Sequence, residues 1–173
     1  MNRSRLAVAL GLALPVLLVG GCSDDPVPQV APHESPAPSV SESSSPQALG
    51  PVATVRAWIK AQNFALQGGD TDALRELSAH PCKACDDFIE PIEDVYAKGG
   101  RFDTRGWKIE GAKARSGSKQ PVVVDTAITI SGGKTVRSAG SQPVAYEAEK
   151  HIMVFKVVQN EGRWAVSFIG FIS

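Results

Sequence analysis

The sequence predicts an α+β domain in which three N-terminal helices pack on one curved antiparallel sheet of about four strands. Two observations predict this class. Apolar residues recur at helical spacing from residue 52 to about residue 97. After Gly100 the pattern changes to runs rich in Val, Ile and Thr that are separated by turn residues, as strands require. The first third of the chain has neither pattern, so we assign the domain to residues 52–173.

Residues 1–21 have the pattern of a secretory signal peptide. Arg3 and Arg5 precede an uncharged apolar run over residues 6–19. A membrane-spanning helix needs about 20 apolar residues, whereas this run is shorter and contains Pro15. We therefore expect the segment to be cleaved rather than to remain in the bilayer.

The residues Val19-Gly20-Gly21-Cys22 resemble the lipobox of bacterial lipoproteins, in which an aliphatic residue and two small residues precede a cysteine. The resemblance implies that the Cys22 sulfur receives a diacylglycerol and that the signal is cut before Cys22. It also implies a new amine that can be acylated, for example by palmitate. Each buried methylene contributes about 0.8 kcal/mol, so two or three chains anchor a protein stably. We expect a lipoprotein on the extracytoplasmic face of the cell membrane; an ordinary signal with an incidental cysteine stays open.

The segment that follows the lipid site, residues 22–51, is expected to be a disordered tether. From Ser23 to Pro51 it holds seven prolines, seven serines and no aromatic residue. Such a composition buries too little apolar surface to offset its ordering entropy. As a random coil it would average roughly 30 Å end to end. The folded domain would therefore stay near the membrane.

The charge balance argues against nucleic acid as a partner. The whole chain has 18 basic and 18 acidic residues, and Arg3 and Arg5 leave with the signal peptide. The mature chain is therefore slightly acidic and has no electrostatic footprint for nucleic acid. The basic residues form no block, and we interpret their sparse cluster as solvated strand ends. This cluster is Lys108, Lys113, Arg115 and Lys119.

The first two helices are defined by periodicity and by their ends. Residues 52–67 carry an apolar stripe, and Gly68-Gly69 ends the helix. A short second helix follows an N-cap at Asp70 or Thr71, where a side-chain oxygen satisfies a free amide, and Pro81 stops it.

The third helix begins near Lys83 and stops at Gly99-Gly100. Acidic residues crowd its first turns, where the helix dipole favours negative charge. Its broad apolar stripe consists of Phe88, Ile89, Ile92, Val95 and Tyr96.

Four main strands are predicted, and short loops between them make neighbours antiparallel. Their expected bounds are Trp107 to Arg115, Val122 to Ile130, about Val144 to Val158, and Arg163 to Ile172. The second of these strands has apolar residues on both faces, including Val123 and Ala127 on the face opposite Val122. We therefore expect the side of the sheet away from the helices to be covered as well; a second copy of the chain, giving a homodimer, is one candidate.

This layout resembles the nuclear transport factor 2-like cone, also called SnoaL-like. The resemblance is to a long helix, a turn written Gly68-Gly69-Asp70, a short helix with Ala73-Leu74, a third helix and successive strands. The lipobox, the Pro/Ser tether and the motif His80-Pro81-Cys82-Lys83-Ala84-Cys85 together resemble actinobacterial lipoproteins of unknown function that carry Cys-x-x-Cys before the third helix.

Once Cys22 is committed to lipid, Cys82 and Cys85 remain in an oxidising compartment, and a disulfide is the main expectation. A ring this small removes little chain entropy, so its role would be to pin the turn between the second and third helices. A thioredoxin-like redox site and a zinc site stay open as alternatives. The redox site lacks a preceding strand, and a zinc site would need ligands beyond His80.

Cones of this type often have a pocket between helices and sheet that holds an Asp, His or Tyr as general acid or base. In this chain the candidate pocket residues are His151, Tyr96 and Trp107, with Glu149 on the same strand face as His151 by alternation. Tyr146, Asp125, Trp58 and Trp164 are further candidates.

No nucleophile motif, phosphate loop or metal cluster supports chemistry at these residues, and no cofactor is implied. We therefore expect a non-catalytic module that binds an envelope protein or a small ligand. The alternatives are a pocket enzyme that uses His151 as its base and a thiol oxidoreductase.

Overall fold

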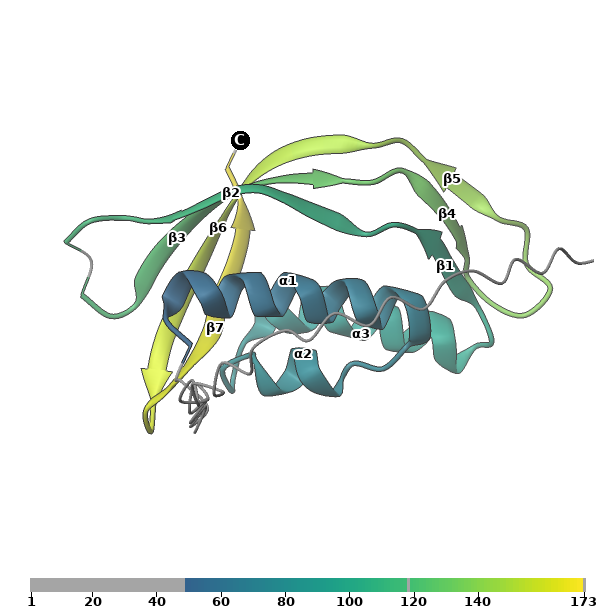
Figure 1. Cartoon of the computed structure of the whole chain (residues 1–173). Coiled ribbons are helices and arrows are strands. Elements are labelled where there is room, and N and C mark those ends of the chain that lie inside the picture. The colour runs from purple at the N-terminus through teal and green to yellow at the C-terminus, as the bar shows by residue number, and fades with distance from the viewer. Residues whose placement is uncertain (1–48, 118, 173) are drawn as a thin grey trace, which may run out of the picture. The chain divides into compact units, whose positions relative to one another are not determined.

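The computed structural model describes residues 49–117 and 119–172 (Figure 1). The predicted signal peptide, the predicted lipid site at Cys22 and the predicted tether up to residue 48 lie outside the described residues. Within the part that the structure describes, no helix is both long enough and apolar enough to cross a bilayer.

Three helices come first in the folded chain, as predicted. They are α1 (Pro51–Gly68), α2 (Asp72–Glu76) and α3 (Lys83–Ala97). Pro51 occupies the first turn of α1, where its missing N–H costs nothing. Gly69 ends α1 in the left-handed conformation, and its N–H donates to the carbonyl of Ala65 at 2.7 Å. The side chain of Asp70, rather than that of Thr71, accepts from the backbone N–H of Asp72 at 3.1 Å.

The strands confirm the α+β class but correct the sheet. The chain forms two antiparallel sheets, in the orders β1-β4-β5 and β2-β3-β6-β7, instead of one sheet of four strands. β1 and β4 were not predicted, and the expected strand from Val144 to Val158 divides into β5 and β6. The strands are β1 (Arg101–Thr104), β2 (Trp107–Ala114), β3 (Val122–Ile130), β4 (Gly133–Val136), β5 (Val144–Tyr146), β6 (Glu149–Asn160) and β7 (Arg163–Phe171).

One bend separates the two sheets. It falls at the same level in three connections of the chain: from β1 to β2, from β3 to β4 and from β5 to β6. On one side of the bend Gly133 pairs with both Thr104 and Tyr146. On the other side Ile130 pairs with both Trp107 and Glu149. Figure 1 accordingly shows β1 leading into β2, β3 into β4, and β5 into β6. The bend lets the strands arch over the helices.

A glycine and a helical asparagine form the bend between β1 and β2. Gly106 has a φ of 76°, and an added Cβ there would lie 2.3 Å from Oδ1 of Asn63. Asn63, on α1, accepts from the backbone N–H of Trp107 at 2.7 Å and donates to its carbonyl at 2.8 Å. The amide side chain thus satisfies the free edge of β2 in place of a neighbouring strand.

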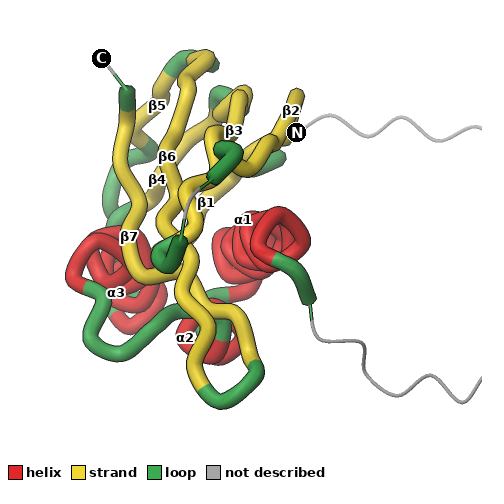
Figure 2. Tube along the Cα trace, turned by 90° about the vertical axis from the view of Figure 1, so that its left-hand side faces the viewer, coloured by secondary structure: helices red, strands yellow, loops and turns green. Residues whose placement is uncertain are grey.

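All three helices lie on one side of the four-stranded sheet (Figure 1). Figure 2 shows the domain from the left-hand side of Figure 1, where β3, β6 and β7 lie. The inner face of this sheet, the one toward the helices, buries Val124, Thr126 and Ile128 of β3. On β6 it buries the alternate residues Met153, Phe155 and Val157. We call the opposite side the outer face, and no described helix covers it.

Candidate functional site

The space between the helices and the sheet, where the resemblance places a candidate pocket, is filled with side chains. Trp58 and Phe155 have no exposed surface, and their rings pack edge to face at 6.0 Å. The indole N–H of Trp58 donates to Oγ of Ser78 at 2.9 Å, so its polar atom is satisfied. The other large, fully buried side chains are Ile59, Leu74, Ile89, Ile128 and Met153. Trp58 therefore fills the core instead of lining a ligand cavity.

Further aromatic rings continue this packing from Trp58 toward β2 and β7. The ring of Phe88, on α3, contacts Trp58 at 6.1 Å, Trp107 at 5.5 Å and Phe171 at 6.4 Å between centroids. These rings come from α1, α3, β2 and β7, so they join the helices to both edges of the sheet. Their packing leaves the candidate residue Trp107 with a structural role.

His151 and Glu149 do form a pair at the rim of this cluster. Nε2 of His151 lies 2.8 Å from a carboxylate oxygen of Glu149, as the strand alternation predicted. The imidazole packs against Phe171 at 5.0 Å between ring centroids. The exposed fraction is 31% for the His151 side chain and 65% for that of Glu149. A general base in this position is open to water on one side and faces no enclosed substrate cavity.

Tyr96, the third candidate pocket residue, lies elsewhere. Its hydroxyl donates to the carbonyl of Leu66 at 2.9 Å, and its ring contacts Phe102 at 6.2 Å. Gly69 passes so close that an added Cβ would lie 2.6 Å from the ring of Tyr96. Tyr96 therefore ties the end of α1 to α3 and β1, and the structure does not bring it together with His151.

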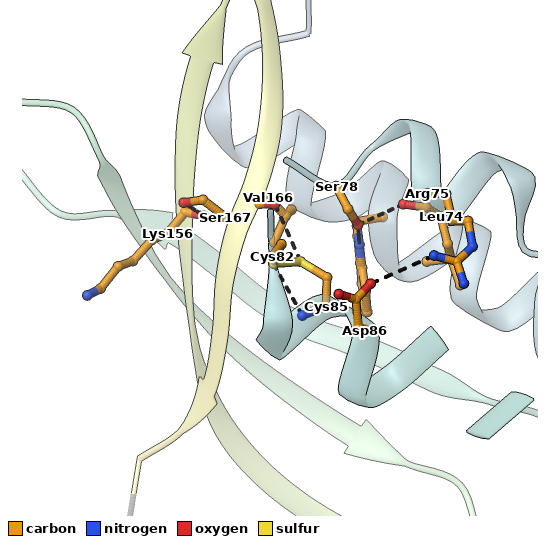
Figure 3. Close-up of a disulfide and its surroundings, with 10 residues drawn as sticks. Leu74, Arg75, Ser78, Cys82, Cys85, Asp86, Lys156, Val166 and Ser167 are labelled. Carbon is orange, nitrogen blue, oxygen red and sulfur yellow. Dashed lines mark hydrogen bonds and ion pairs between the residues drawn. A yellow bond between two sulfur atoms is a disulfide. The ribbon is translucent and has the colours of Figure 1, made fainter. Parts of the chain in front are cut away.

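Cys82 and Cys85 form a disulfide at the start of α3 (Figure 3). Both are buried, and Sγ of Cys82 accepts from the backbone N–H of Cys85 at 3.2 Å. Sγ of Cys85 lies 3.4 Å from the carbonyl oxygen of Val166 on β7. Thiol exchange requires a thiolate that can reach the disulfide, so burial opposes the redox alternative. The disulfide pins the turn between α2 and α3 against β7.

Replacing both cysteines, as Cys82→Ala/Cys85→Ala, is expected to lower the free energy of unfolding by about 2 kcal/mol while the fold is kept. The cause is the lost constraint on the unfolded chain. Guanidinium unfolding followed by circular dichroism measures the change, with dithiothreitol-treated wild-type protein as the matched control. Equal stability of the wild-type and doubly substituted chains would contradict a structural role.

Acidic residues of α3 bind the α2 segment through hydrogen bonds and ion pairs. Arg75 donates two hydrogen bonds to the Glu93 carboxylate, at 2.9 and 2.6 Å, and Thr71 donates a third at 2.6 Å. These bonds, the one from Arg75 first, hold the pKa of Glu93 below its usual value. The network is partly exposed and serves to orient the two helices. Within the described ranges, no group of three metal-ligating side chains comes together.

The outer face of the four-stranded sheet has an apolar centre. Ile152 is 52% exposed, Phe168 39% and Ile172 47%. The N–H of Ile172 donates to the carbonyl of Ile152 at 2.9 Å, so these two residues are neighbours. Half-buried Val154 and Val158 extend the centre along β6. The expectation of apolar residues on both faces of this sheet is thus confirmed, and a partner for the outer face stays a prediction.

Lysines surround this centre, and the acids beside them are already neutralised. Two oxygens of Asp125 accept from Arg115 at 2.8 and 2.7 Å, which lowers the pKa of Asp125. Glu110 accepts from Lys108 at 3.1 Å and from Thr129 at 3.0 Å, and these bonds lower its pKa. Three further lysines of this face form no ion pair with any residue that the structure describes. They are Lys113, Lys150 and Lys156.

The surface of the described residues includes two hollows. One, of about 550 Å³, lies between the end of α3 and the strands β1 and β4, and Asp94, Lys98, Phe102 and Arg137 are among its lining residues. The other, of about 490 Å³, lies on the four-stranded sheet, and Glu110, Lys150, His151 and Ile152 are among its lining residues. Neither brings His151, Tyr96 and Trp107 together.

The family model that matches this chain is described as a family of unknown function, DUF6318, and the match spans residues 31–168. The chain belongs to this family. No curated protein sequence matches it.

Several solved structures resemble the DUF6318 chain. The intermembrane space region of the chloroplast protein ARC6 superposes with a TM-score of 0.52 at 8% identity, covering 69% of this chain and 92% of that one. This likeness shows the fold alone. The SEC-C motif protein RPA3114 from Rhodopseudomonas palustris has a TM-score of 0.40 at 16% identity, covering 72% and 80%. A chain named Rd1NTF2 has a TM-score of 0.35 at 13% identity, covering 69% and 96%. The last two scores say nothing further about function.

The residues of DUF6318 that sequence reasoning missed are on the outer face. Lys150 and Lys156 were not singled out, although Lys108 and Lys113 were. Thr129 pairs with both Lys108 and Lys150, so register alone brings these two lysines to one row. The available signal was the alternation of β6, which places Lys150, Ile152, Val154 and Lys156 on a single face.

Proposed function

We propose that this DUF6318 protein is an exported lipoprotein of the actinobacterial type, held at the extracytoplasmic face of the cell membrane by lipid on Cys22. Its domain, a nuclear transport factor 2-like cone, would act as a non-catalytic module that binds an envelope component. The lipobox-like Val19-Gly20-Gly21-Cys22, the apolar signal segment and the Pro/Ser-rich tether support the anchor.

The observation on which the non-catalytic role rests is the filled interior. Catalysis in a cone would need a cavity that excludes water and holds a substrate against an acid or base. Trp58, Phe88 and Phe155 occupy that space, and the His151–Glu149 pair sits at its open rim. Binding by an outer surface is the role that the described side chains support best.

The anchor is tested by Cys22→Ser in a lipoprotein-processing bacterium fed a clickable palmitate analogue. Wild-type protein should take up the label, begin at residue 22 and sediment with membranes, whereas the Cys22→Ser chain should stay unlabelled. The chain with Cys82→Ala/Cys85→Ala is the matched control and should be labelled as wild type. Unmodified Cys22, or Met1 still attached, in mass spectra of the wild-type product would refute the anchor.

The second candidate function is a pocket enzyme with His151 as general base, favoured by the 2.8 Å contact to Glu149. A carboxylate partner is what orients a catalytic imidazole. The exposed fraction of Glu149, 65%, and the lack of an enclosing wall weigh against this role. Envelope proteins cross-linked to wild-type protein and to His151→Ala in equal amounts would favour the binding module.

A further inference from the structure

The outer face of the four-stranded sheet is an amphipathic surface without a cover among the described residues. Its centre is apolar, and Figure 3 shows Lys156 pointing away from the disulfide and the helices, on the far side of the sheet. The ammonium of Lys156 lies 4.9 Å from the centre of the Phe168 ring. A cation and an aromatic ring are therefore in contact with each other on the solvent-exposed outer face.

The cations of this surface are arranged around the apolar centre. Lys150 lies at one end of β6, next to Ile152, and Lys156 lies toward the other end, paired with Phe168. Lys113 extends the basic side across β2, where Asp125 of β3 is opposite it in the strand register. Because Arg115 already neutralises Asp125, these three lysines present net positive charge.

Two of the three helices, α2 and α3, carry the opposite sign. Acidic residues outnumber the basic ones on α2 and α3. The acids are Asp72, Glu76, Asp86, Asp87, Glu90, Glu93 and Asp94, against Arg75 and Lys83, with Lys98 directly after α3. α1 carries two exposed basic residues, Arg56 and Lys60, so the excess of negative charge is confined to α2 and α3. An anionic surface would therefore attract the outer face and repel the side formed by α2 and α3.

This charge pattern decides between the occupants of the face. A symmetric pair of copies would bring two patches of the same net positive charge together, so the lysines of one copy would face a surface of like sign. An anionic lipid surface offers phosphates to the lysines and an apolar layer to Ile152, Phe168 and Ile172. Lysines that surround aromatic and aliphatic side chains are the composition of surfaces that lie in the headgroup region.

We propose that the outer face docks on the anionic headgroups of the membrane, with Ile152, Phe168 and Ile172 entering the headgroup layer and the three lysines contacting phosphates. The inference rests on the proposed lipid anchor, because a tether of roughly 30 Å keeps the face within reach of the bilayer. Docking would point the helices and the hollow lined by Arg137 away from the membrane.

The test uses the mature chain from residue 22 with Cys22→Ser, so that acyl chains contribute nothing. It is sedimented with vesicles of phosphatidylcholine alone or with phosphatidylglycerol at equal parts. We expect binding to the anionic vesicles only, weakening with salt. Lys150→Glu/Lys156→Glu should weaken it by more than about 30-fold, because it removes two cations and adds two anions. Ile152→Ser/Phe168→Ser should weaken it as well.

The matched control is Arg56→Glu/Lys60→Glu, which changes net charge equally on exposed positions of α1. It should bind within about twofold of the parent, because its charges lie away from the outer face. Equal losses in the two charge variants would overturn the proposal, as would equal binding to both vesicle types. Dimers in sedimentation equilibrium that Ile152→Ser/Phe168→Ser dissolves would assign the face to a second copy instead.

The vesicle experiment tests docking separately from the lipid anchor. Palmitate labelling of wild-type Cys22 without vesicle binding by the Cys22→Ser chain would refute docking and leave the lipoprotein assignment standing. Vesicle binding without labelling would refute the anchor alone. Circular dichroism of every variant shows that it is folded before it is compared.

Discussion

Trp58→Ala is expected to lower the free energy of unfolding by about 3–5 kcal/mol, the cost of a large cavity in a packed core. Trp58 has no exposed surface and contacts both Phe88 and Phe155. The substitution also leaves Oγ of Ser78 without its donor, although that hydroxyl still donates to the carbonyl of Leu74 at 2.8 Å. Loss of transfer free energy and of dispersion contacts dominates.

The measurement is guanidinium unfolding of the mature chain, followed by circular dichroism because the substitution removes a fluorophore. The m-value should be unchanged, so that the shift in midpoint reports stability. Trp58→Phe is the matched control: it keeps an aromatic ring, loses the bond to Ser78 and should cost about 1–2 kcal/mol. A loss below about 1 kcal/mol for Trp58→Ala would mean that the interior is loose, and the pocket enzyme would become the better hypothesis.

The helices and the long strands could be predicted because their signals are local. The apolar stripe and the double glycines place α1 and α3, and the alternation of β3 gives its buried face. β1 and β4 have only four residues each, with exposed charged side chains at Arg101 and Lys134, so no apolar run marks them. The break between β5 and β6 falls at Glu147-Ala148, where neither glycine nor proline interrupts the pattern.

The candidate site shows the same division between local and distant information. The His151–Glu149 contact follows from strand alternation and could be predicted. The partners of Tyr96 and Trp107 could not, because Leu66 and Asn63 are distant in sequence and belong to another element. The outer-face lysines were split between two predicted strands, and only the pairing through Thr129 of β3 shows that Lys108 and Lys150 share a row.

Asn63→Ala is expected to lower the free energy of unfolding by about 2–4 kcal/mol, which is more than the partial burial of Asn63 suggests. Its amide makes two hydrogen bonds to the backbone of Trp107, so truncation leaves an N–H and a carbonyl unsatisfied at a partly buried strand edge. No other strand can replace the amide there, because β2 is the edge strand of its sheet. The bend at Gly106, whose missing Cβ makes room for Oδ1 of Asn63, should loosen with it.

Hydrogen exchange separates this local effect from general destabilisation. The backbone amide of Trp107 should exchange with solvent far faster in Asn63→Ala than in wild type. The exchange rates of the β6 amides should change only as much as the free energy of global unfolding changes. Phe64→Ala, at the next position of α1 and 61% exposed, is the matched control and should change stability by less than about 0.5 kcal/mol. Asn63→Asp keeps the acceptor for the Trp107 N–H but loses the donor, so it should fall between Asn63→Ala and wild type. Equal protection of Trp107 in all these variants would show that the arch holds without its contact to α1.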